Sequence, residues 1–205
     1  MVKMTWVDRR TCLVSSTPQG TDEWLEERKG KITSTAISKI LGESPFFYGD
    51  DSDIVDSING KKEEFSDEAI RRMQLGTDYE PKVRRLVEKR LGVNIRELGL
   101  AVWKRDPRFA ASLDGEINED IGIEIKCPEK MYTLFEKDGT IWRNHINQMT
   151  TAGVITGKKK MLYCVYSILE KKLVMRMIDV DYNRWNKEMY PKCIKFLDEN
   201  KSKIK

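Results

Sequence analysis

The apolar residues of this chain recur at helical spacing in its first half. Residues 21–28 predict a short helix, because Thr21 can cap the first turn and acidic residues follow it, where the helix dipole favours them. Residues 66–91 form the longest helical pattern, with Gly76 as a candidate interruption and Gly92 as the end. Residues 31–41 predict a helix that stops at Gly42, from the spacing of Ile32, Ala36, Ile37, Ile40 and Leu41.

After Gly92 the apolar positions alternate, which is typical of β-strands, and helical spacing returns only later. Residues 43–59 are expected to be a loop, because they contain Pro45 and several Asp and Ser residues. The order of elements predicts an α/β fold, in which a mixed central sheet is flanked by helices. We expect strands at 93–103, 109–117 and 122–126, a turn at 118–121, a helix at 141–155, a hairpin of 161–169 and 173–180, and a closing helix from 181 onward.

Length and composition fit one soluble domain spanning residues 1–205, since 40% of the residues are hydrophobic and 34% are charged. No run reaches the roughly 18 apolar residues that cross a bilayer, and the N-terminus has no apolar stretch for a secretory signal. The four cysteines lie far apart, which disfavours a zinc site and fits reduced thiols. We therefore expect no membrane partner and an intracellular protein, in the cytoplasm or nucleus of a host cell or associated with a virus, that is not secreted.

Positive charge is local, because the formal net charge is only +4. Basic residues gather at Lys29 and Lys31, at Arg71 and Arg72, and within 82–90 and 158–160. Solvated helix faces would explain any one of these clusters. Together they allow a positive groove along nucleic-acid phosphates.

The most informative segment lies between residues 112 and 128. Side chains alternate between the two faces of a strand, so Glu124 and Lys126 should face away from the isoleucines around them. The turn at 118–121 should bring Asp114 beside Glu124. Two carboxylates, with the carbonyl of Ile125, could hold Mg²⁺, which prefers oxygen ligands and keeps several waters. Lys126 could then orient a water or neutralise charge. The alternative is an exposed hairpin with a surface ion pair that contributes at most about 1 kcal/mol.

This grouping resembles the PD-(D/E)XK nuclease superfamily, and within it the phage-lambda-type exonuclease and YqaJ-like viral recombinase group. Residues 111–115 (ASLDG) and 124–128 (EIKCP) are similar to two of the group's blocks. Three further segments follow the group's order, which makes coincidence improbable: 20–28 (GTDEWLEER) with 32–35 (ITST), 76–81 (GTDYEP), and 145–148 (HINQ). Two positions depart from the group's pattern, where His145 replaces a tyrosine and Thr150 replaces a second glutamine.

The resemblance implies roles for residues outside the core motif. It makes Glu80 a third acidic group at the metal site, although Thr77 and Glu80 could instead form a capping box. It places Trp24 and Arg28 at the active-site cleft, with Arg28 on a DNA phosphate; core packing with a snorkelling arginine is the alternative. It also implies a phosphate contact for Thr35, with Ser34 or Thr33 as alternatives, and a DNA contact for Gln148. His145 could be a general base, but a packing histidine is the more common case.

The implied activity is a Mg²⁺-dependent exonuclease, with Mn²⁺ as a substitute, that degrades one strand from the ends of double-stranded DNA in the 5′ to 3′ direction. It would serve viral or phage recombination, with a single-strand annealing protein as a partner. The chain could also assemble as a homo-oligomer, which is a trimer in the resembling enzymes. Two alternatives stay open from the sequence. One is a structure- or sequence-specific endonuclease with the same core, and the other is a non-catalytic DNA-binding module.

Overall fold

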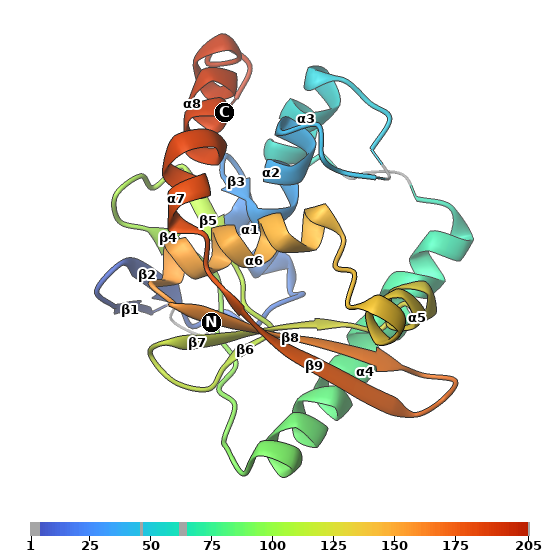
Figure 1. Ribbon diagram of the computed structural model, residues 1–205. Helices are drawn as coiled ribbons and strands as arrows, with labels where there is room; N and C mark the ends of the chain where they lie inside the picture. The colour runs from blue at the N-terminus through green and yellow to red at the C-terminus, as the bar shows by residue number, and fades with distance from the viewer. Residues whose placement is uncertain (1–4, 46, 62–64, 205) are drawn as a thin grey trace.

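The computed structural model describes residues 5–45, 47–61 and 65–204, which form two β-sheets with helices packed on and between them (Figure 1). The strands are β1 (Trp6–Asp8), β2 (Cys12–Ser15), β3 (Ile32–Thr33), β4 (Ala101–Trp103), β5 (Phe109–Ala111), β6 (Gly115–Glu116), β7 (Ile121–Lys126), β8 (Lys160–Ser167) and β9 (Lys172–Asp179). The helices are α1 (Asp22–Arg28), α2 (Ser34–Ile40), α3 (Asp51–Ile58), α4 (Asp67–Leu91), α5 (Glu129–Asp138), α6 (Arg143–Thr156), α7 (Tyr182–Arg184), the π-helical turn η1 (Trp185–Met189) and α8 (Tyr190–Glu199).

Both sheets are mixed. The first has the order β1-β2-β4-β5-β3, in which only β3 and β5 are parallel, and the second has the order β6-β7-β8-β9, in which only β7 and β8 are parallel. The chain crosses from one sheet to the other between β5 and β6, and Asp114 lies in that link. The predicted α/β class with flanking helices is confirmed. The predicted single central sheet is two sheets, because strand periodicity does not show where consecutive strands change partners.

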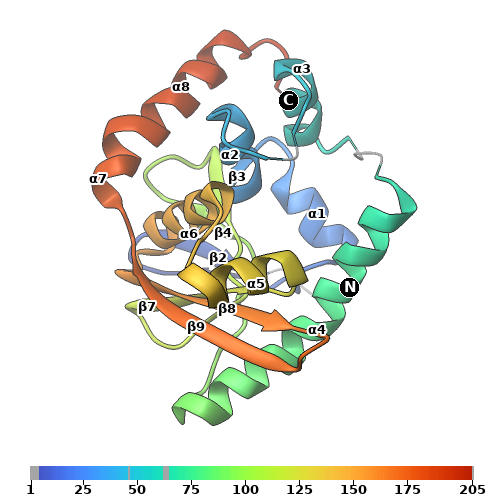
Figure 2. The same ribbon diagram turned by 45° about the vertical axis from the view of Figure 1, so that its right-hand side comes forward.

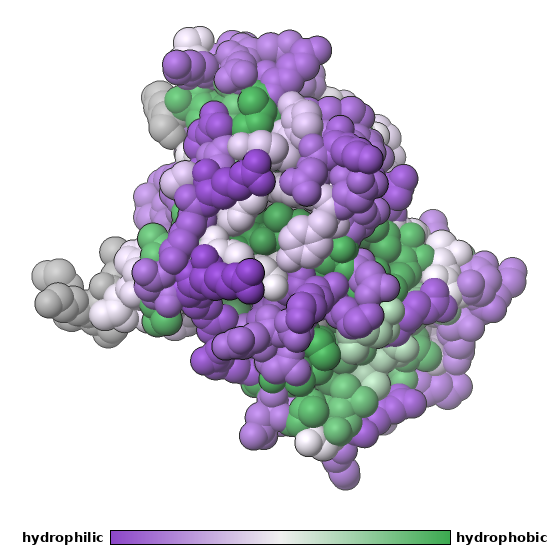
Figure 3. Space-filling view, turned by 60° about the vertical axis from the view of Figure 1, so that its left-hand side comes forward, coloured by the Kyte–Doolittle hydropathy of each residue, from purple (hydrophilic) through white to green (hydrophobic). Residues whose placement is uncertain are grey.

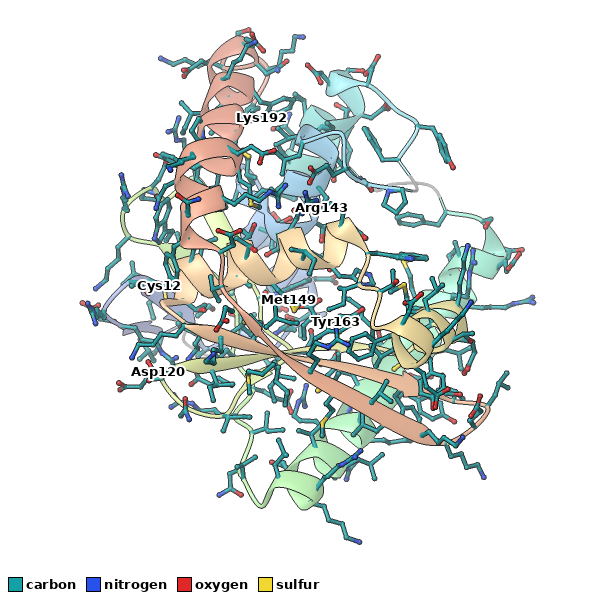
Figure 4. The ribbon with its side chains drawn as sticks, viewed as in Figure 1. Cys12, Asp120, Arg143, Met149, Tyr163 and Lys192 are labelled. Atoms are coloured by element: carbon teal, nitrogen blue, oxygen red, sulfur yellow. The ribbon has the colours of Figure 1, made fainter. Side chains whose placement is uncertain are left out.

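Strands β7 and β8 of the second sheet are buried on both faces, whereas the edge strand β9 is only partly covered. Alternate residues of β8 separate into two apolar clusters: Tyr163 packs with Met149 of α6 and Phe135 of α5, whereas Cys164 packs with residues of α4. Figure 2 shows α4 on one side of this sheet and α5 and α6 on the other, and Figure 4 shows the labelled Met149 and Tyr163 near where α6 crosses the sheet. The same alternation in β7 turns Ile123 toward α4 and the neighbouring polar residues toward α6.

Several predicted helix boundaries are confirmed. Thr21 caps α1, where its hydroxyl accepts a hydrogen bond from the backbone N–H of Trp24. α4 begins after Ser66 and ends at Gly92, whose positive φ of 66° is a left-handed conformation that glycine adopts without strain. Gly76 does not interrupt α4. The predicted β8–β9 hairpin is present, and the predicted C-terminal helix is α7, η1 and α8 in succession.

Other local predictions were wrong. Nearly half of the expected loop at 43–59 is helix α3, because Asp50 and Asp53 form a capping box and Ile54, Val55 and Ile58 are buried; Phe46 lies outside the described residues. The expected helix at 31–41 begins only at Ser34, since Ile32 and Thr33 pair with β5. Within 93–103 only Ala101–Trp103 forms a strand, and Arg96 makes an isolated bridge to Glu116. Strands β1 and β2 were not predicted, and β1 is fully exposed.

Polar side chains cover much of the face shown in Figure 3, and apolar side chains gather across its centre and lower right. All four cysteines are buried and unpaired, as the sequence predicted. Within the described ranges, no helix combines the length and the apolar character needed to cross a bilayer.

Candidate active site

Strand pairing brings Asp114 and Glu124 together. β6 runs antiparallel to β7 with Gly115 opposite Ile123, so Asp114 is drawn toward Glu124. The Asp114 Oδ2 atom accepts a hydrogen bond of 2.6 Å from the backbone N–H of Ile125. The Nζ atom of Lys126 lies 2.5 Å from Glu124 Oε1, and Glu124 is only 6% exposed. The predicted convergence of these three side chains is therefore present, and they are more buried than in the alternative of an exposed hairpin.

The site concentrates negative charge. Burial raises the pKa of Asp114 well above its ordinary value, and the nearby carboxylates of Glu124 and Glu80 raise it further. Burial opposes the charged form of Lys126, but the carboxylates of Glu124 and Asp114 outweigh this effect and raise its pKa. Lys126 is thus a cation at neutral pH. A further positive charge beside Asp114 would relieve its repulsion from the other carboxylates.

Glu80 reaches the same cluster from helix α4. Its Oε1 atom lies 2.6 Å from Arg84 Nη2, and burial raises the pKa of Glu80 while Arg84 and Lys126 lower it. The alternative of a Thr77–Glu80 capping box is wrong, because α4 is continuous there and Thr77 donates to the backbone carbonyl of Met73. Arg84 was not predicted at the site. Its signal in the sequence is the spacing of four residues between Glu80 and Arg84 on one helix.

A pocket of about 210 Å³ opens over the carboxylates. Elements from both sheets and from α1, α2 and α6 contribute to its wall. Eight of its lining residues were predicted, Thr33 was named as a substitute, and Gln19 and Ser112 were not predicted. The predicted ligands Glu80 and Ile125 lie outside the lining. The lining residues are Gln19, Trp24, Arg28, Thr33, Ser34, Thr35, Ser112, Asp114, Glu124, Lys126 and Gln148.

Two of the unpredicted lining residues hold the frame of the pocket. Gln19 Nε2 donates to the backbone carbonyls of Leu98 (2.7 Å) and Leu113 (2.8 Å), the residue before Asp114. The hydroxyl of Ser112 accepts a hydrogen bond of 3.2 Å from Trp24 Nε1. Ser112 lies within the motif block at 111–115, whereas no sequence signal marks Gln19, because its partners are 79 and 94 residues away.

Trp24 and Arg28 form a stacked pair at the pocket wall. The Arg28 guanidinium carbon lies 4.2 Å from the centre of the Trp24 ring, a cation–π arrangement. Trp24 also packs against the small apolar cluster of Leu100, Val102 and Ala110, so its packing role is present as well. Burial lowers the pKa of Arg28 to about 10, and no carboxylate in the described part of the chain offsets this. Arg28 is therefore a partly buried cation that can pair with a bound anion.

Two polar atoms at the pocket lack hydrogen-bond partners among the described residues. Ser34 Oγ and Gln148 Oε1 are buried without a hydrogen bond to any described residue. Buried polar groups are normally satisfied, so these atoms are available to a ligand. His145, in contrast, is buried with Nδ1 2.8 Å from the Tyr163 hydroxyl, and burial lowers its pKa to about 3. It does not line the pocket, and this environment fits the packing role rather than a general base.

The donor set suits a hard divalent cation. The described residues contain no group of three His, Cys, Asp or Glu side chains placed to hold a metal ion. This excludes, for those residues, a closed cage of the zinc type. Mg²⁺ needs few protein ligands, since it keeps several waters and shares the remaining positions with phosphate. Asp114 and Glu124 fit that requirement, and the raised pKa of Asp114 marks where positive charge is missing.

Three solved structures with a similar fold have titles that name exonucleases. An alkaline exonuclease (LHK-Exo) from Laribacter hongkongensis is 24% identical with a TM-score of 0.76, over 89% of this chain and 93% of that chain. LHK-Exo in complex with dAMP gives 25% identity and a TM-score of 0.77 over the same shares. A phage related exonuclease from Haemophilus somnus 129PT is 14% identical with a TM-score of 0.53, over 84% of this chain and 95% of that chain.

A family model matches the part of the chain that contributes most of the pocket lining. Curated proteins gave no match. The model of the YqaJ-like viral recombinase domain matches residues 23–159, well over half of the chain, and this range includes all lining residues of the pocket except Gln19. With the likeness of fold to LHK-Exo, the match shows that the chain belongs to the YqaJ-like viral recombinase family and has the PD-(D/E)XK nuclease fold.

Proposed function

We propose that this protein is a Mg²⁺-dependent exonuclease that hydrolyses phosphodiester bonds at the ends of double-stranded DNA. The observation that carries the proposal is that Asp114, Glu124 and Lys126 line one pocket together with Arg28, a cation that forms no ion pair with another described residue. The titles of the similar structures support the exonuclease class, and one of those structures holds a nucleotide, dAMP.

The proposed chemistry divides the pocket into two parts. Asp114 and Glu124, with Glu80 and the Ile125 carbonyl as further candidates, would hold the metal, and Mn²⁺ would substitute for Mg²⁺. A bound divalent ion supplies Lewis-acid charge at the phosphate and lowers the pKa of water. Lys126 stays protonated and can neutralise charge that develops in the transition state. Arg28, Ser34, Thr35 and Gln148 would hold the neighbouring part of the DNA strand, with Trp24 supporting Arg28.

The size of the pocket favours a strand end. Its volume of about 210 Å³ is below the roughly 300–1,000 Å³ of clefts that enclose whole small molecules. It therefore suits one phosphodiester and its immediate neighbours. Several finer points rest on the family likeness or on composition and are part of this proposal. They are the 5′ to 3′ direction, a role in viral or phage recombination, a single-strand annealing partner, assembly as a trimer, an intracellular site of action and a single domain over 1–205.

Digestion of end-labelled linear duplex beside covalently closed circular duplex, with and without Mg²⁺, tests the proposal. We expect stepwise release of nucleotides from the linear DNA, dependence on Mg²⁺, and an intact circle. Labels at the 5′ and 3′ ends report the direction. Equal cutting of the circle would identify the endonuclease alternative, and DNA binding without any product would identify the non-catalytic alternative.

A further inference from the structure

Arg84 connects two of the acidic residues at the candidate active site. It lies on α4 one turn after Glu80 and is only 7% exposed. Its Nη2 atom contacts Glu80 Oε1 at 2.6 Å, and its Nε atom donates to the backbone carbonyl of Asp114 at 2.9 Å. Its Nη1 atom forms an ion pair with Glu97, whose side chain is mostly exposed. One buried guanidinium thus joins α4 to the link between the two sheets.

The contacts hold Asp114 from two sides. Arg84 binds the main-chain carbonyl of Asp114, and the backbone N–H of Ile125 binds its carboxylate. The approach is close at the next residue, where a Cβ on Gly115 would lie 2.4 Å from Ile95 Cγ2 and 3.8 Å from Arg84 Nε. Gly115 therefore lets the link pass close to Ile95, in ordinary van der Waals contact with Arg84. Without the guanidinium, Asp114 would keep its contact with β7, and the link would be held besides only through the neighbouring Leu113 carbonyl by Gln19, as far as the described residues show.

The charges at this site also depend on Arg84. Glu80, Asp114 and Glu124 contribute three acidic groups, and Arg84 and Lys126 contribute two cations, each in contact with one carboxylate. The Glu80 side chain is 32% exposed, so it has room to turn toward solvent if its partner is removed. The contact with Arg84 keeps this carboxylate on the side of α4 that faces Asp114.

We propose that Arg84 is a positioning residue that holds Glu80 against the Asp114 main chain, so that Glu80 serves the metal site without lining the pocket. This inference rests on the proposed function. A guanidinium suits the role because its planar set of N–H donors reaches three partners at once, whereas a lysine ammonium presents its donors at one point. Residues that orient metal ligands in this way usually affect metal affinity about 10–100-fold.

The test compares Arg84→Met and Arg84→Lys with wild type, and uses Arg85→Met as the matched control. Arg85 is the next residue of α4 and is exposed, and among the described residues its side chain hydrogen-bonds only to the backbone carbonyl of Pro81 in its own helix. Titration calorimetry with Ca²⁺, in the absence of DNA, measures metal affinity independently of cleavage. We expect the dissociation constant to rise about tenfold or more in Arg84→Met, less in Arg84→Lys, and not in Arg85→Met.

A second measurement separates positioning from general damage to the fold. The rate of linear-duplex digestion is followed against Mg²⁺ concentration, and high Mg²⁺ should restore most of the rate of Arg84→Met, because only metal capture is impaired. The loss of metal-binding free energy in the double variant Arg84→Met with Glu80→Gln should be smaller than the sum of the losses in the two single variants, since both changes act on one carboxylate. Fully additive losses would contradict the proposal.

Wild-type metal affinity in a folded Arg84→Met protein would overturn the inference. If Arg84→Met does not fold, as judged by circular dichroism, Arg84→Lys keeps the charge, and unchanged metal affinity in that variant overturns it equally. These results differ from failure of the proposed function, in which the wild-type protein itself neither binds a divalent ion nor digests linear DNA.

Discussion

The carboxylate of Asp114 is held by the backbone of Ile125 through a hydrogen bond of 2.6 Å. Ile125 lies between Glu124 and Lys126, and its own side chain is buried in the opposite apolar cluster, beside α4. Core packing on one face of β7 therefore fixes the register of the polar groups on the other face. Small errors in this register would move every group of the site at once.

Asp114→Asn should abolish cleavage while the fold is retained. The asparagine Oδ1 atom can accept the same hydrogen bond from Ile125, but a neutral amide is a poor ligand for Mg²⁺. We expect the rate on linear duplex to fall by about three orders of magnitude, consistent with the loss of a few kcal/mol of transition-state stabilisation. Glu119→Gln, at an exposed position in the following turn, is the control and should cut normally. A near-normal rate for Asp114→Asn would remove Asp114 from the site.

Lys126→Met should slow the chemical step without weakening metal binding. The ammonium contacts Glu124 at 2.5 Å. Its removal leaves less positive charge near the carboxylates, which should then attract a divalent cation at least as strongly as before. We expect the single-turnover rate to fall about 100-fold or more, with Ca²⁺ affinity unchanged or higher. If Ca²⁺ affinity falls together with the rate, Lys126 supports the metal site rather than the reaction.

The alternation of side chains along strands and the local sequence motifs predicted the residues at the centre of the site. The face of β7 that carries Glu124 and Lys126 follows from the isoleucine spacing, and helix caps such as Thr21 and Gly92 follow from residue type alone. The helix α3 was missed because Asp50 and Asp53, which favour loops in general, here cap the helix.

The contacts that join distant segments could not be predicted. Gln19 reaches carbonyls 79 and 94 residues away, and Arg84 reaches Asp114 across 30 residues. Such partners depend on which strands meet, and alternation gives the face of a strand but not its neighbour. The division of the strands into two sheets has the same cause.

Arg28→Met should weaken DNA binding and reduce its dependence on salt. A partly buried guanidinium stacked at 4.2 Å from the Trp24 ring centre is suited to one phosphate, and each phosphate contact releases about one counterion. In Ca²⁺, which should support binding without efficient cutting, we expect the slope of log affinity against log salt to fall by about one. Fluorescence anisotropy of labelled duplex measures this. Lys29→Met, an exposed neighbour paired with Glu26, should change the slope less.

Gln148→Leu should separate stability from binding. Its Oε1 atom is buried without a partner in the described chain, and an unsatisfied buried polar atom costs about 1–3 kcal/mol. Replacement by an apolar side chain of similar size should therefore keep or raise the melting temperature, while DNA affinity in Ca²⁺ falls. Ser34→Ala should behave in the same way, because Ser34 Oγ is also unpartnered. A loss of stability with unchanged DNA affinity would show that these atoms serve the fold.

A buried ion cluster beside the site gives a prediction about stability and pH. Glu116 contacts the buried Lys158 at 2.6 Å and also Arg9 and Arg96. Burial alone would raise the pKa of Glu116, but hydrogen bonds from these three cations outweigh it and lower the pKa to about 2. Since the pKa is lower in the folded state, the stabilisation is complete above about pH 4.5 and is lost as pH falls toward 2.

Glu116→Gln should therefore destabilise the protein by about 3–5 kcal/mol at pH 7, because the Lys158 side chain, which is 1% exposed, would lose its carboxylate partner. The matched control is Asp120→Asn, which removes the partner of the adjacent Lys159 in an exposed ion pair of 3.1 Å and should cost at most about 1 kcal/mol. Urea unfolding at pH 7 and pH 3 measures both changes. The difference in unfolding free energy between Glu116→Gln and wild type should be smaller at pH 3 than at pH 7. At pH 3 Glu116 is protonated in the unfolded state, which already reduces the stability of the wild-type protein. Equal costs for the two variants at pH 7 would mean that Lys158 reaches water or another partner when Glu116 is neutral.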